Sequence, residues 1–142
     1  MLEDVLVRFG QYFGKPRGWE RVIRWLSPPG KLSGSELIIR QFPEGYSFFI
    51  DPGTLIGWYL YFFWTYEPEV RRVMKQVVTS GSVAIDVGAN VGWHTMFLSL
   101  LVGEKGRVFA FEPNPSTRER LVLGLKLNQF VNVQVMEAAL SD

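Results

Sequence analysis

The stretch Val83-Ala-Ile-Asp-Val-Gly-Ala-Asn-Val-Gly92 decides the fold of this chain. Its first half is typical of a fully buried strand, its second half is a glycine loop, and an apolar helix pattern follows over residues 93–101. The alternation continues with a buried strand over residues 108–111, a helix over 115–128 and a strand over 133–136. Strands and helices alternating at these lengths predict parallel crossover units in an α/β, doubly wound sheet.

The sequence ahead of this region predicts helices and a hairpin. Apolar residues at helical spacing over 5–26 indicate two short amphipathic helices, broken around residues 14–16. An interfacial membrane helix has the same pattern, but packing on the chain's own domain is the preferred interpretation. Residues 36–41 and 46–50 predict the two strands of a hairpin, and Thr54 is expected to cap the apolar helix after it.

A further helix is predicted just before the glycine loop. Pro68 suits a first helical position and Gly81 suits the residue that ends a helix. The apolar residues expected to share one face of this helix are Val70, Val73, Met74, Val77 and Val78. We therefore expect three segments: N-terminal helices and hairpin (1–50), a helical lead-in (51–81), and the part with alternating strands and helices (82–142).

Composition excludes several classes of protein. The 142 residues are 47% hydrophobic and 20% charged, which is not typical of a disordered chain. The net charge of +1 gives no electrostatic reason to expect nucleic acid as a partner. No cysteine and one histidine argue against a disulfide framework or a metal site. The longest apolar run, residues 55–64, is shorter than the roughly 20 residues that a membrane span needs, and we expect a cytoplasmic protein.

Polar residues stand where two neighbouring strands should end. Ligands of an open parallel sheet bind outside the carboxyl ends of its strands. Asp86 ends the first strand and Glu112 follows the second, where its carboxylate would suit two ribose hydroxyls. Gly88 and Gly92 permit a close approach of the backbone, and Asn90 tolerates a left-handed conformation. The sequence thus predicts a nucleoside site at this edge.

Two classes of nucleoside ligand fit such a site. A nicotinamide or flavin dinucleotide also uses a glycine loop and an acid after the second strand. The loop here lacks the GxGxxG spacing, and Asp86 would repel a pyrophosphate. S-adenosylmethionine carries no phosphate, and its ammonium and sulfonium groups favour a nearby carboxylate. The charges therefore favour the methyl donor.

Four ordered motifs within residues 50–142 carry a resemblance to a known family. These are Val83-Ala-Ile-Asp-Val-Gly-Ala-Asn-Val-Gly-Trp-His-Thr95, Val108-Phe-Ala-Phe-Glu-Pro-Asn-Pro115, Leu127-Asn-Gln-Phe-Val-Asn-Val133 and Ala138-Ala-Leu-Ser-Asp142, preceded by Tyr66-Glu-Pro68. The region resembles the FkbM-type family of class I S-adenosylmethionine-dependent methyltransferases. The resemblance implies a Rossmann-like sheet, of which this chain holds the first three parallel strands. It also implies methylation of a hydroxyl on a sugar or another small metabolite.

The resemblance implies a set of cofactor-binding residues. Those at the methionine end, the ribose and the adenine are, in order along the chain, Asp86, Gly88, Ala89, Asn90, Gly92, Glu112, Pro113 and Ala139. No catalytic residue can be carried over, because the family's substrate-side residues lie beyond Asp142. His94 is expected to pack or to flank the cofactor rather than to act as a base.

Two alternatives remain open at this point. Glu112 could instead be a capping acid for the helix after it. The chain could also be a truncated, non-catalytic remnant or interaction module, since three parallel strands leave one edge and much of one face uncovered. We expect the 142-residue chain alone to be inactive and to associate with itself through that surface. Rings between residues 58 and 64 could wall a substrate pocket, although core packing is the preferred interpretation.

Overall fold

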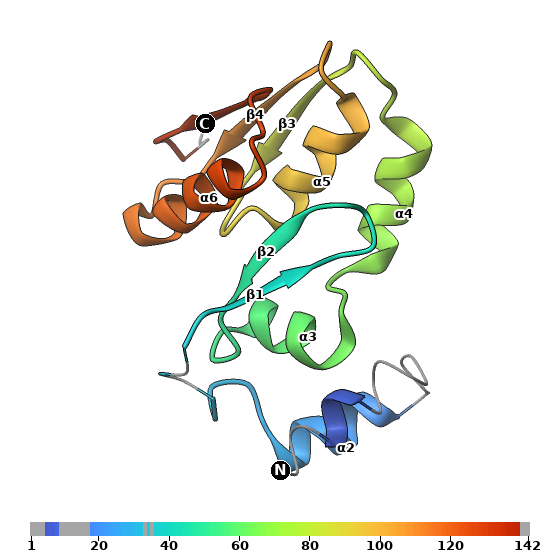
Figure 1. Ribbon diagram of the computed structural model, residues 1–142, viewed down its shortest axis with the longest axis vertical. Coiled ribbons are helices and arrows are strands. Elements are labelled where there is room, and N and C mark those ends of the chain that lie inside the picture. The colour runs from blue at the N-terminus through green and yellow to red at the C-terminus, as the bar shows by residue number, and fades with distance from the viewer. Residues whose placement is uncertain (1–4, 9–17, 33, 35, 140–142) are drawn as a thin grey trace. The chain divides into compact units, whose positions relative to one another are not determined.

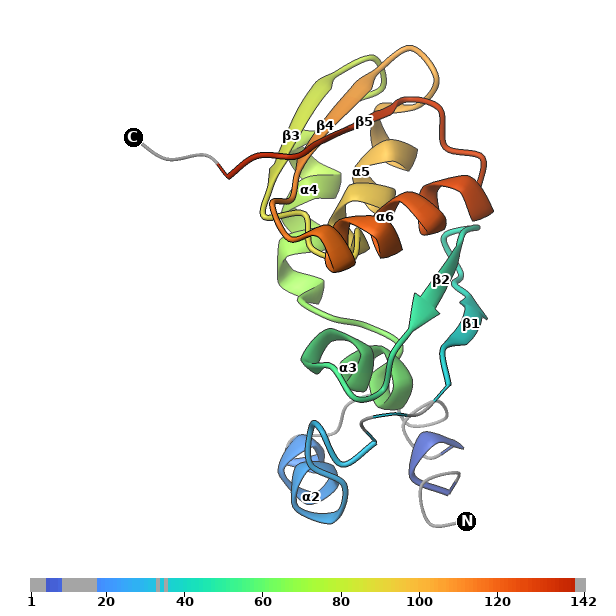
Figure 2. The same cartoon turned by 90° about the vertical axis from the view of Figure 1, so that its left-hand side faces the viewer.

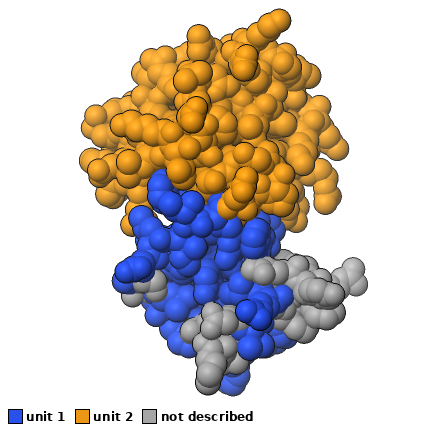
Figure 3. Space-filling model, viewed as in Figure 1, with its two compact units in different colours: residues 1–40, 49–67 blue, residues 41–48, 68–142 orange. Residues whose placement is uncertain are grey.

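The computed structural model describes residues 5–8, 18–32, 34 and 36–139 (Figure 1). The chain divides into two compact units (Figure 3). Unit 1 comprises residues 1–40 and 49–67, and unit 2 comprises residues 41–48 and 68–142. None of the helices within the described ranges has the length and apolar character to cross a membrane.

Unit 1 is built from helices around a core of aromatic rings. Its helices are a turn at residues 5–8, α2 (Trp19–Leu26) and α3 (Leu55–Phe63). The predicted cap of α3 is confirmed, because Thr54 Oγ1 accepts a hydrogen bond of 3.1 Å from the Gly57 amide. The predicted break at residues 14–16 lies outside the described residues.

The buried rings of α3 pack in the core of unit 1, which was the preferred interpretation of the sequence. Trp58 and Phe62 are fully buried and Phe63 is 7% exposed, and all three pack with Ile23 of α2. The Trp58 indole N–H donates to the Ser27 carbonyl at 2.6 Å, so the one polar atom of this side chain is satisfied. Large buried rings therefore supply most of the apolar contact in unit 1.

The predicted hairpin is confirmed. β1 (Ile38–Gln41) and β2 (Ser47–Ile50) pair as a two-stranded sheet. We call residues 42–48 the hairpin tip; they belong to unit 2 together with Gln41. Asn128 binds the tip with both ends of its side-chain amide: Oδ1 accepts from the Ser47 amide and Nδ2 donates to the Ser47 carbonyl, each at 2.7 Å. The side chain thus pairs with Ser47 as a neighbouring strand would.

Unit 2 is an α/β layer with a parallel sheet (Figures 1 and 2). Its elements are α4 (Pro68–Val77), β3 (Val83–Val87), α5 (Trp93–Val102), β4 (Arg107–Phe111), α6 (Pro115–Leu127) and β5 (Val133–Met136). The strand order is β3-β4-β5 with both pairs parallel, which confirms the predicted sheet.

One face of the sheet is covered and the other is not. Leu98 and Val102 of α5 pack on Val108 of the sheet, with Met74, Val78, Ala84 and Val133 around them. On the opposite face of β3, Val83, Ile85 and Val87 are 66%, 62% and 58% exposed. The expectation of a fully buried first strand is therefore wrong, whereas the expected uncovered face is present. Strands that run in one direction with right-handed crossovers place both crossover helices on the same side.

The expected apolar face of α4 is only partly buried, because Met74 and Val78 pack on the core whereas the other three residues are exposed. Val70, Val73 and Val77 are 41%, 54% and 69% exposed, while Arg71 is only 6% exposed. Arg71 is held by rings, since its guanidinium carbon lies 4.3 Å from the Trp93 ring centre and 3.8 Å from that of Phe97. The same side chain donates to Tyr46 Oη at 3.0 Å and forms an ion pair with Glu44 at 3.3 Å. These contacts rotate the helix so that its arginine faces inward.

Candidate functional site

The register of the sheet brings the two predicted acids to one edge. Asp86 of β3 stands opposite Ala110 of β4, and Val87 stands opposite Phe111. Glu112 follows Phe111 directly, so both acids lie at the carboxyl ends of neighbouring parallel strands. The end of β5 joins them, because the Glu112 amide donates to the Met136 carbonyl at 3.1 Å.

The glycine loop, residues 88–92, has the backbone that its composition predicts. Gly88, Asn90 and Gly92 have φ angles of 75°, 51° and 91°, all in the left-handed region. Gly92 has a second constraint, since a Cβ built there would lie 2.4 Å from Leu121 Cδ1. A Cβ at Gly88 would meet no atom within 4 Å, so only its φ angle favours glycine.

Every backbone amide of the glycine loop already has an acceptor within the protein. The Gly88 and Ala89 amides both donate to the Phe111 carbonyl at 2.9 Å, and the Gly92 amide donates to the Ala89 carbonyl at 2.9 Å. The Asn90 amide donates to Glu112 Oε2, and the Val91 amide to Asn90 Oδ1, each at 2.8 Å. A phosphate cradle needs N–H groups that point at the ligand. The five amides of this loop stabilise its own conformation, so they do not form a phosphate cradle.

Asp86 is oriented by a residue that the sequence analysis missed. Its Oδ2 accepts a hydrogen bond of 2.6 Å from Thr95 Oγ1, and Thr95 is fully buried in α5. Among the described residues no donor to Asp86 Oδ1 is found, so that oxygen is available to a cationic group. The sequence signal for Thr95 was weak, because α5 contains a second hydroxyl residue, Ser99.

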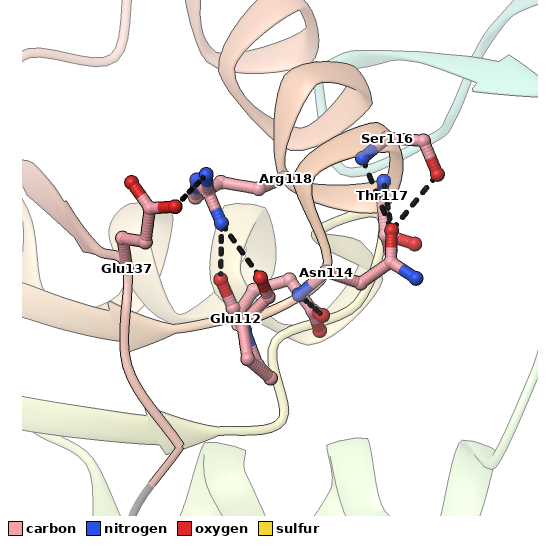
Figure 4. Close-up of polar contacts among 7 residues, drawn as sticks. Glu112, Asn114, Ser116, Thr117, Arg118 and Glu137 are labelled. Carbon is pink, nitrogen blue, oxygen red and sulfur yellow. Dashed lines mark hydrogen bonds and ion pairs between the residues drawn. The ribbon is translucent and has the colours of Figure 1, made fainter.

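Glu112 is buried, and its carboxylate contacts both the glycine loop and Asn114; Figure 4 shows the contact with Asn114. Its Oε2 accepts from Asn90 and its Oε1 accepts from the Asn114 amide, each at 2.8 Å, and the residue is 7% exposed. A carboxylate oxygen accepts more than one hydrogen bond, so each keeps capacity for a ligand hydroxyl. The helix cap of α6 is Asn114, whose Oδ1 accepts from the amides of Ser116 and Thr117 at 3.0 and 3.2 Å. The capping function considered for Glu112 is thus carried out by Asn114.

The remaining predicted site residues differ in accessibility. Pro113 and Ala139 are exposed, whereas Ala89 is 5% exposed and could offer a ligand only its backbone carbonyl. His94 is partly buried in the first turn of α5. Within the described ranges, no group of three or more His, Cys, Asp or Glu side chains could hold a metal ion.

The hairpin tip packs on Trp93, the residue directly after the glycine loop, within unit 2. Trp93 is the first residue of α5 and is 2% exposed. Its ring centre lies 5.0 Å from that of Phe42, 5.4 Å from that of Phe48 and 6.1 Å from that of Tyr46. Burial raises the pKa of the Tyr46 hydroxyl well above its usual value, against the opposing charge of Arg71. The tip therefore fixes the helix turn that continues from the loop.

A cavity of about 270 Å³ lies away from this site. Ser99, Gly103, Gln129, Asn132 and neighbouring residues line it, at the end of α5 and in the turn before β5. These residues lie at the amino ends of the strands, where the predicted acids are absent. The cavity is therefore separate from the candidate site.

Comparison with known proteins identifies methyltransferases as relatives. The chain is 42% identical over 55 residues to the hexuronic acid methyltransferase AglP of Haloferax volcanii, a match that covers 39% of this chain and 21% of that protein. The solved structure of M. jannaschii TYW2 in complex with AdoMet aligns with a TM-score of 0.58 and 28% identity, over 75% of this chain and 46% of that one. A Clostridium thermocellum protein named as a "putative rRNA-methylase" aligns with a TM-score of 0.50 and 26% identity, over 51% and 39%.

These findings confirm the predicted fold class, a Rossmann-like methyltransferase sheet represented by three parallel strands. The chain spans less than half the length of each of these relatives. No family model matches the chain, so the FkbM-type family stays a prediction. The exclusion of nucleic acid as a partner has no support, because a protein named as an rRNA methylase shares the fold. At the coarser level, the homologue and the structural neighbours support a class I S-adenosylmethionine-dependent methyltransferase.

Proposed function

We propose that this chain is the cofactor-binding part of an S-adenosylmethionine-dependent methyltransferase that acts on a hydroxyl oxygen of a sugar or another small metabolite. The observation that carries the choice of cofactor is the state of the glycine loop. All five amides of residues 88–92 are engaged within the protein, and Asp86 Oδ1 is available beside them.

This arrangement suits a cation and opposes a pyrophosphate. A dinucleotide would bring two negative charges to a loop without available donors and next to a carboxylate. S-adenosylmethionine presents a positive charge at the same place. The carboxylate of Asp86, held in position by Thr95, would attract the ammonium or sulfonium group.

The proposed roles of the other residues follow from their positions. Glu112 would accept hydrogen bonds from the ribose hydroxyls with the remaining capacity of its two oxygens. Pro113 would border the ribose and Ala139, after β5, the adenine. Gly88, Ala89, Asn90 and Gly92 would shape the floor of the methionine end through their backbone.

Catalysis by these residues would consist mainly of placement. When bound, S-adenosylmethionine supplies an electrophilic methyl group on a sulfonium. Residues of this chain would hold the adenosine and the amino-acid part rigidly, which is the entropic part of the rate enhancement. Both carboxylates are suited to this, because the buried Glu112 and the partly buried Asp86 are each held by a neighbour at 2.8 Å or less.

The proposed acceptor rests on one relative. The protein of Haloferax volcanii is named for a hexuronic acid, and its similarity covers 39% of this chain. Transfer of labelled methyl groups by the whole gene product to uronic-acid saccharides, to neutral sugars and to RNA would test this part separately. Labelled RNA with unlabelled saccharides would refute the sugar assignment and leave the cofactor assignment intact.

The cofactor assignment is tested by calorimetric titration of the whole gene product. S-adenosylhomocysteine and NADH would each be titrated into the wild type, Asp86→Asn, Glu112→Gln and the exposed control Glu104→Gln. We expect the wild type and the control to bind S-adenosylhomocysteine and to ignore NADH. Asp86→Asn removes only a charge and should weaken binding roughly tenfold, since a charge-assisted hydrogen bond is lost. Binding of NADH, or equal affinity in all four proteins, would end the assignment.

A further inference from the structure

Arg118 occupies a position that the helix itself disfavours. It lies in the first turn of α6, after the cap Asn114 and Pro115. The amino end of a helix carries a partial positive charge, so a cation there is repelled. The Arg118 side chain is nevertheless only 17% exposed and has a defined direction. Contacts outside the helix must therefore fix it.

Those contacts reach two strand ends (Figure 4). Arg118 Nη1 donates to the carbonyl oxygens of Glu112 and Pro113, at 3.1 and 2.9 Å. Its Nη2 forms an ion pair of 2.8 Å with Glu137 Oε1. A planar guanidinium can satisfy three acceptors at once in a fixed geometry, which a lysine ammonium on a flexible stem does less well. The side chain thus links the segment after β4 to the segment after β5.

The link continues into the glycine loop through Glu112. The backbone carbonyl of Glu112 binds Arg118, while its carboxylate binds the Asn90 amide. Glu137 follows β5 directly and stands two residues ahead of Ala139. One connected series, Glu137 to Arg118 to Glu112 to Asn90, therefore runs across the ends of all three strands.

The ion pair between Arg118 and Glu137 should contribute little to the free energy of folding. The Glu137 side chain is 71% exposed, and pairs with an exposed partner are screened by water and contribute little to folding. What the pair does set is the spacing between the segments that follow β4 and β5. In the proposed cofactor site those segments border the ribose and the adenine.

We propose that Arg118 is a positioning residue for the adenosine half of the cofactor, a role that rests on the proposed function. It holds the segments after β4 and β5 at the separation that a nucleoside needs, and it fixes the backbone of Glu112 so that the carboxylate faces the ribose. It does not touch the methionine half. Its loss should therefore weaken every ligand that contains adenosine by the same factor.

The test compares two ligands in the whole gene product. S-adenosylhomocysteine contains both halves of the cofactor, and 5′-methylthioadenosine lacks the amino-acid part. Their dissociation constants would be measured by calorimetry for the wild type, Arg118→Met, Arg118→Lys, Glu137→Gln and Asp86→Asn. Arg107→Met is the matched control, because Arg107 is exposed at the other end of β4. Thermal unfolding without ligand would be recorded for each.

We expect Arg118→Met to raise both dissociation constants by the same factor, roughly tenfold, because nucleoside binding must then also order the segments after β4 and β5. Arg118→Lys should lie between it and the wild type, and Glu137→Gln should raise both constants slightly. Asp86→Asn should affect S-adenosylhomocysteine alone, and Arg107→Met neither ligand. The unliganded unfolding temperature of Glu137→Gln should match that of the control, whereas Arg118→Met should unfold at a lower temperature, since it loses three contacts of a mostly buried side chain.

Three results would overturn the role of Arg118. The first is that Arg118→Met binds both ligands with wild-type affinity, and the second is that Arg118→Met loses affinity for S-adenosylhomocysteine only. The third is that Glu137→Gln binds both ligands with wild-type affinity. If Arg118→Met melts early, the well-folded Glu137→Gln still decides, since its carboxylate is mostly exposed. A wild type that binds neither ligand would instead refute the proposed function.

Discussion

Unit 1 and unit 2 use their polar side chains differently. In unit 1, Arg40 lies 4.3 Å from the Trp64 ring centre and donates to the carbonyls of Leu60 and Tyr61 at 2.9 and 3.1 Å. This arginine serves the end of α3 and its rings, and burial lowers its pKa. In unit 2, Asp86, Glu112 and Arg118 gather instead at the carboxyl ends of three strands.

This difference indicates which unit has polar side chains that could bind a ligand. The contacts of Arg40 are with the backbone at the end of α3 and with a ring of the same unit. The two acids of unit 2 are fixed by neighbours and still retain accepting capacity. We therefore assign ligand binding to unit 2 and packing to the described part of unit 1, and the substitutions below test that separation in order of decreasing effect.

The largest expected effect is on unit 1. Trp58→Ala removes a fully buried ring and should lower the free energy of unfolding by about 3–5 kcal/mol. Trp25→Ala is the matched control, because Trp25 is 82% exposed, and it should change stability by less than about 0.5 kcal/mol. Chemical denaturation would measure both. If Trp58→Ala also abolished binding of S-adenosylhomocysteine at low temperature, packing and binding would not be separable between the units.

Two glycine substitutions sharpen the description of unit 2. Gly92→Ala combines a left-handed backbone with a clash against Leu121, and should cost about 2–4 kcal/mol. Gly88→Ala has the same backbone cost without the clash, and should cost about 1–2 kcal/mol. Thermal unfolding distinguishes them. Equal losses would mean that Leu121 moves aside freely.

A smaller effect is expected from the residue behind Asp86. Thr95→Val keeps the shape of the side chain and removes the hydroxyl that donates to Asp86 Oδ2. The net loss should be about 1 kcal/mol, or roughly a fivefold weaker affinity for S-adenosylhomocysteine. Thr95→Ser retains the donor and should bind like the wild type. Similar weakening by both variants would show that packing of the methyl group, and not orientation of Asp86, is what matters.

The smallest effect concerns alkaline pH. Burial raises the pKa of Tyr46, so above about pH 10 the unfolded chain releases this proton while the folded chain retains it. The folded state then binds more protons, and the free energy of unfolding falls as pH rises. Tyr46→Phe should flatten that fall. Tyr59→Phe in unit 1 should flatten it less, because Tyr59 is only partly buried. Denaturation at pH 8 and pH 11 gives the comparison.

Local chemistry explains what the sequence could predict. The strands of unit 2, the left-handed Asn90 and the cap of α3 by Thr54 depend on residues close together in the chain. The meeting of Asp86 and Glu112 needed one more step, the rule that parallel strands present their carboxyl ends together. These features are therefore predictable from periodicity and turn residues.

What the sequence could not predict depends on distant partners. Thr95 and Arg118 act through contacts with residues on other elements, so neither carries a local signature. The burial of Arg71 follows from rings of α5, and the exposure of β3 follows from which side the crossover helices take. Apolar periodicity shows that a face exists, but the neighbours decide whether it is covered.

The pairing of Asn128 with Ser47, and the rings of Phe42 and Phe48 around Trp93, bear on how the molecule can be shortened for study. A protein shortened to begin at Val83 or at Pro68 would lack Phe42 and Phe48, which pack on Trp93. In the version that begins at Pro68, Arg71 would also lose its contacts with Tyr46 and Glu44. Trimming should therefore stop ahead of Gln41. The seven residues of the hairpin tip, although remote in sequence, belong with the parallel sheet of unit 2.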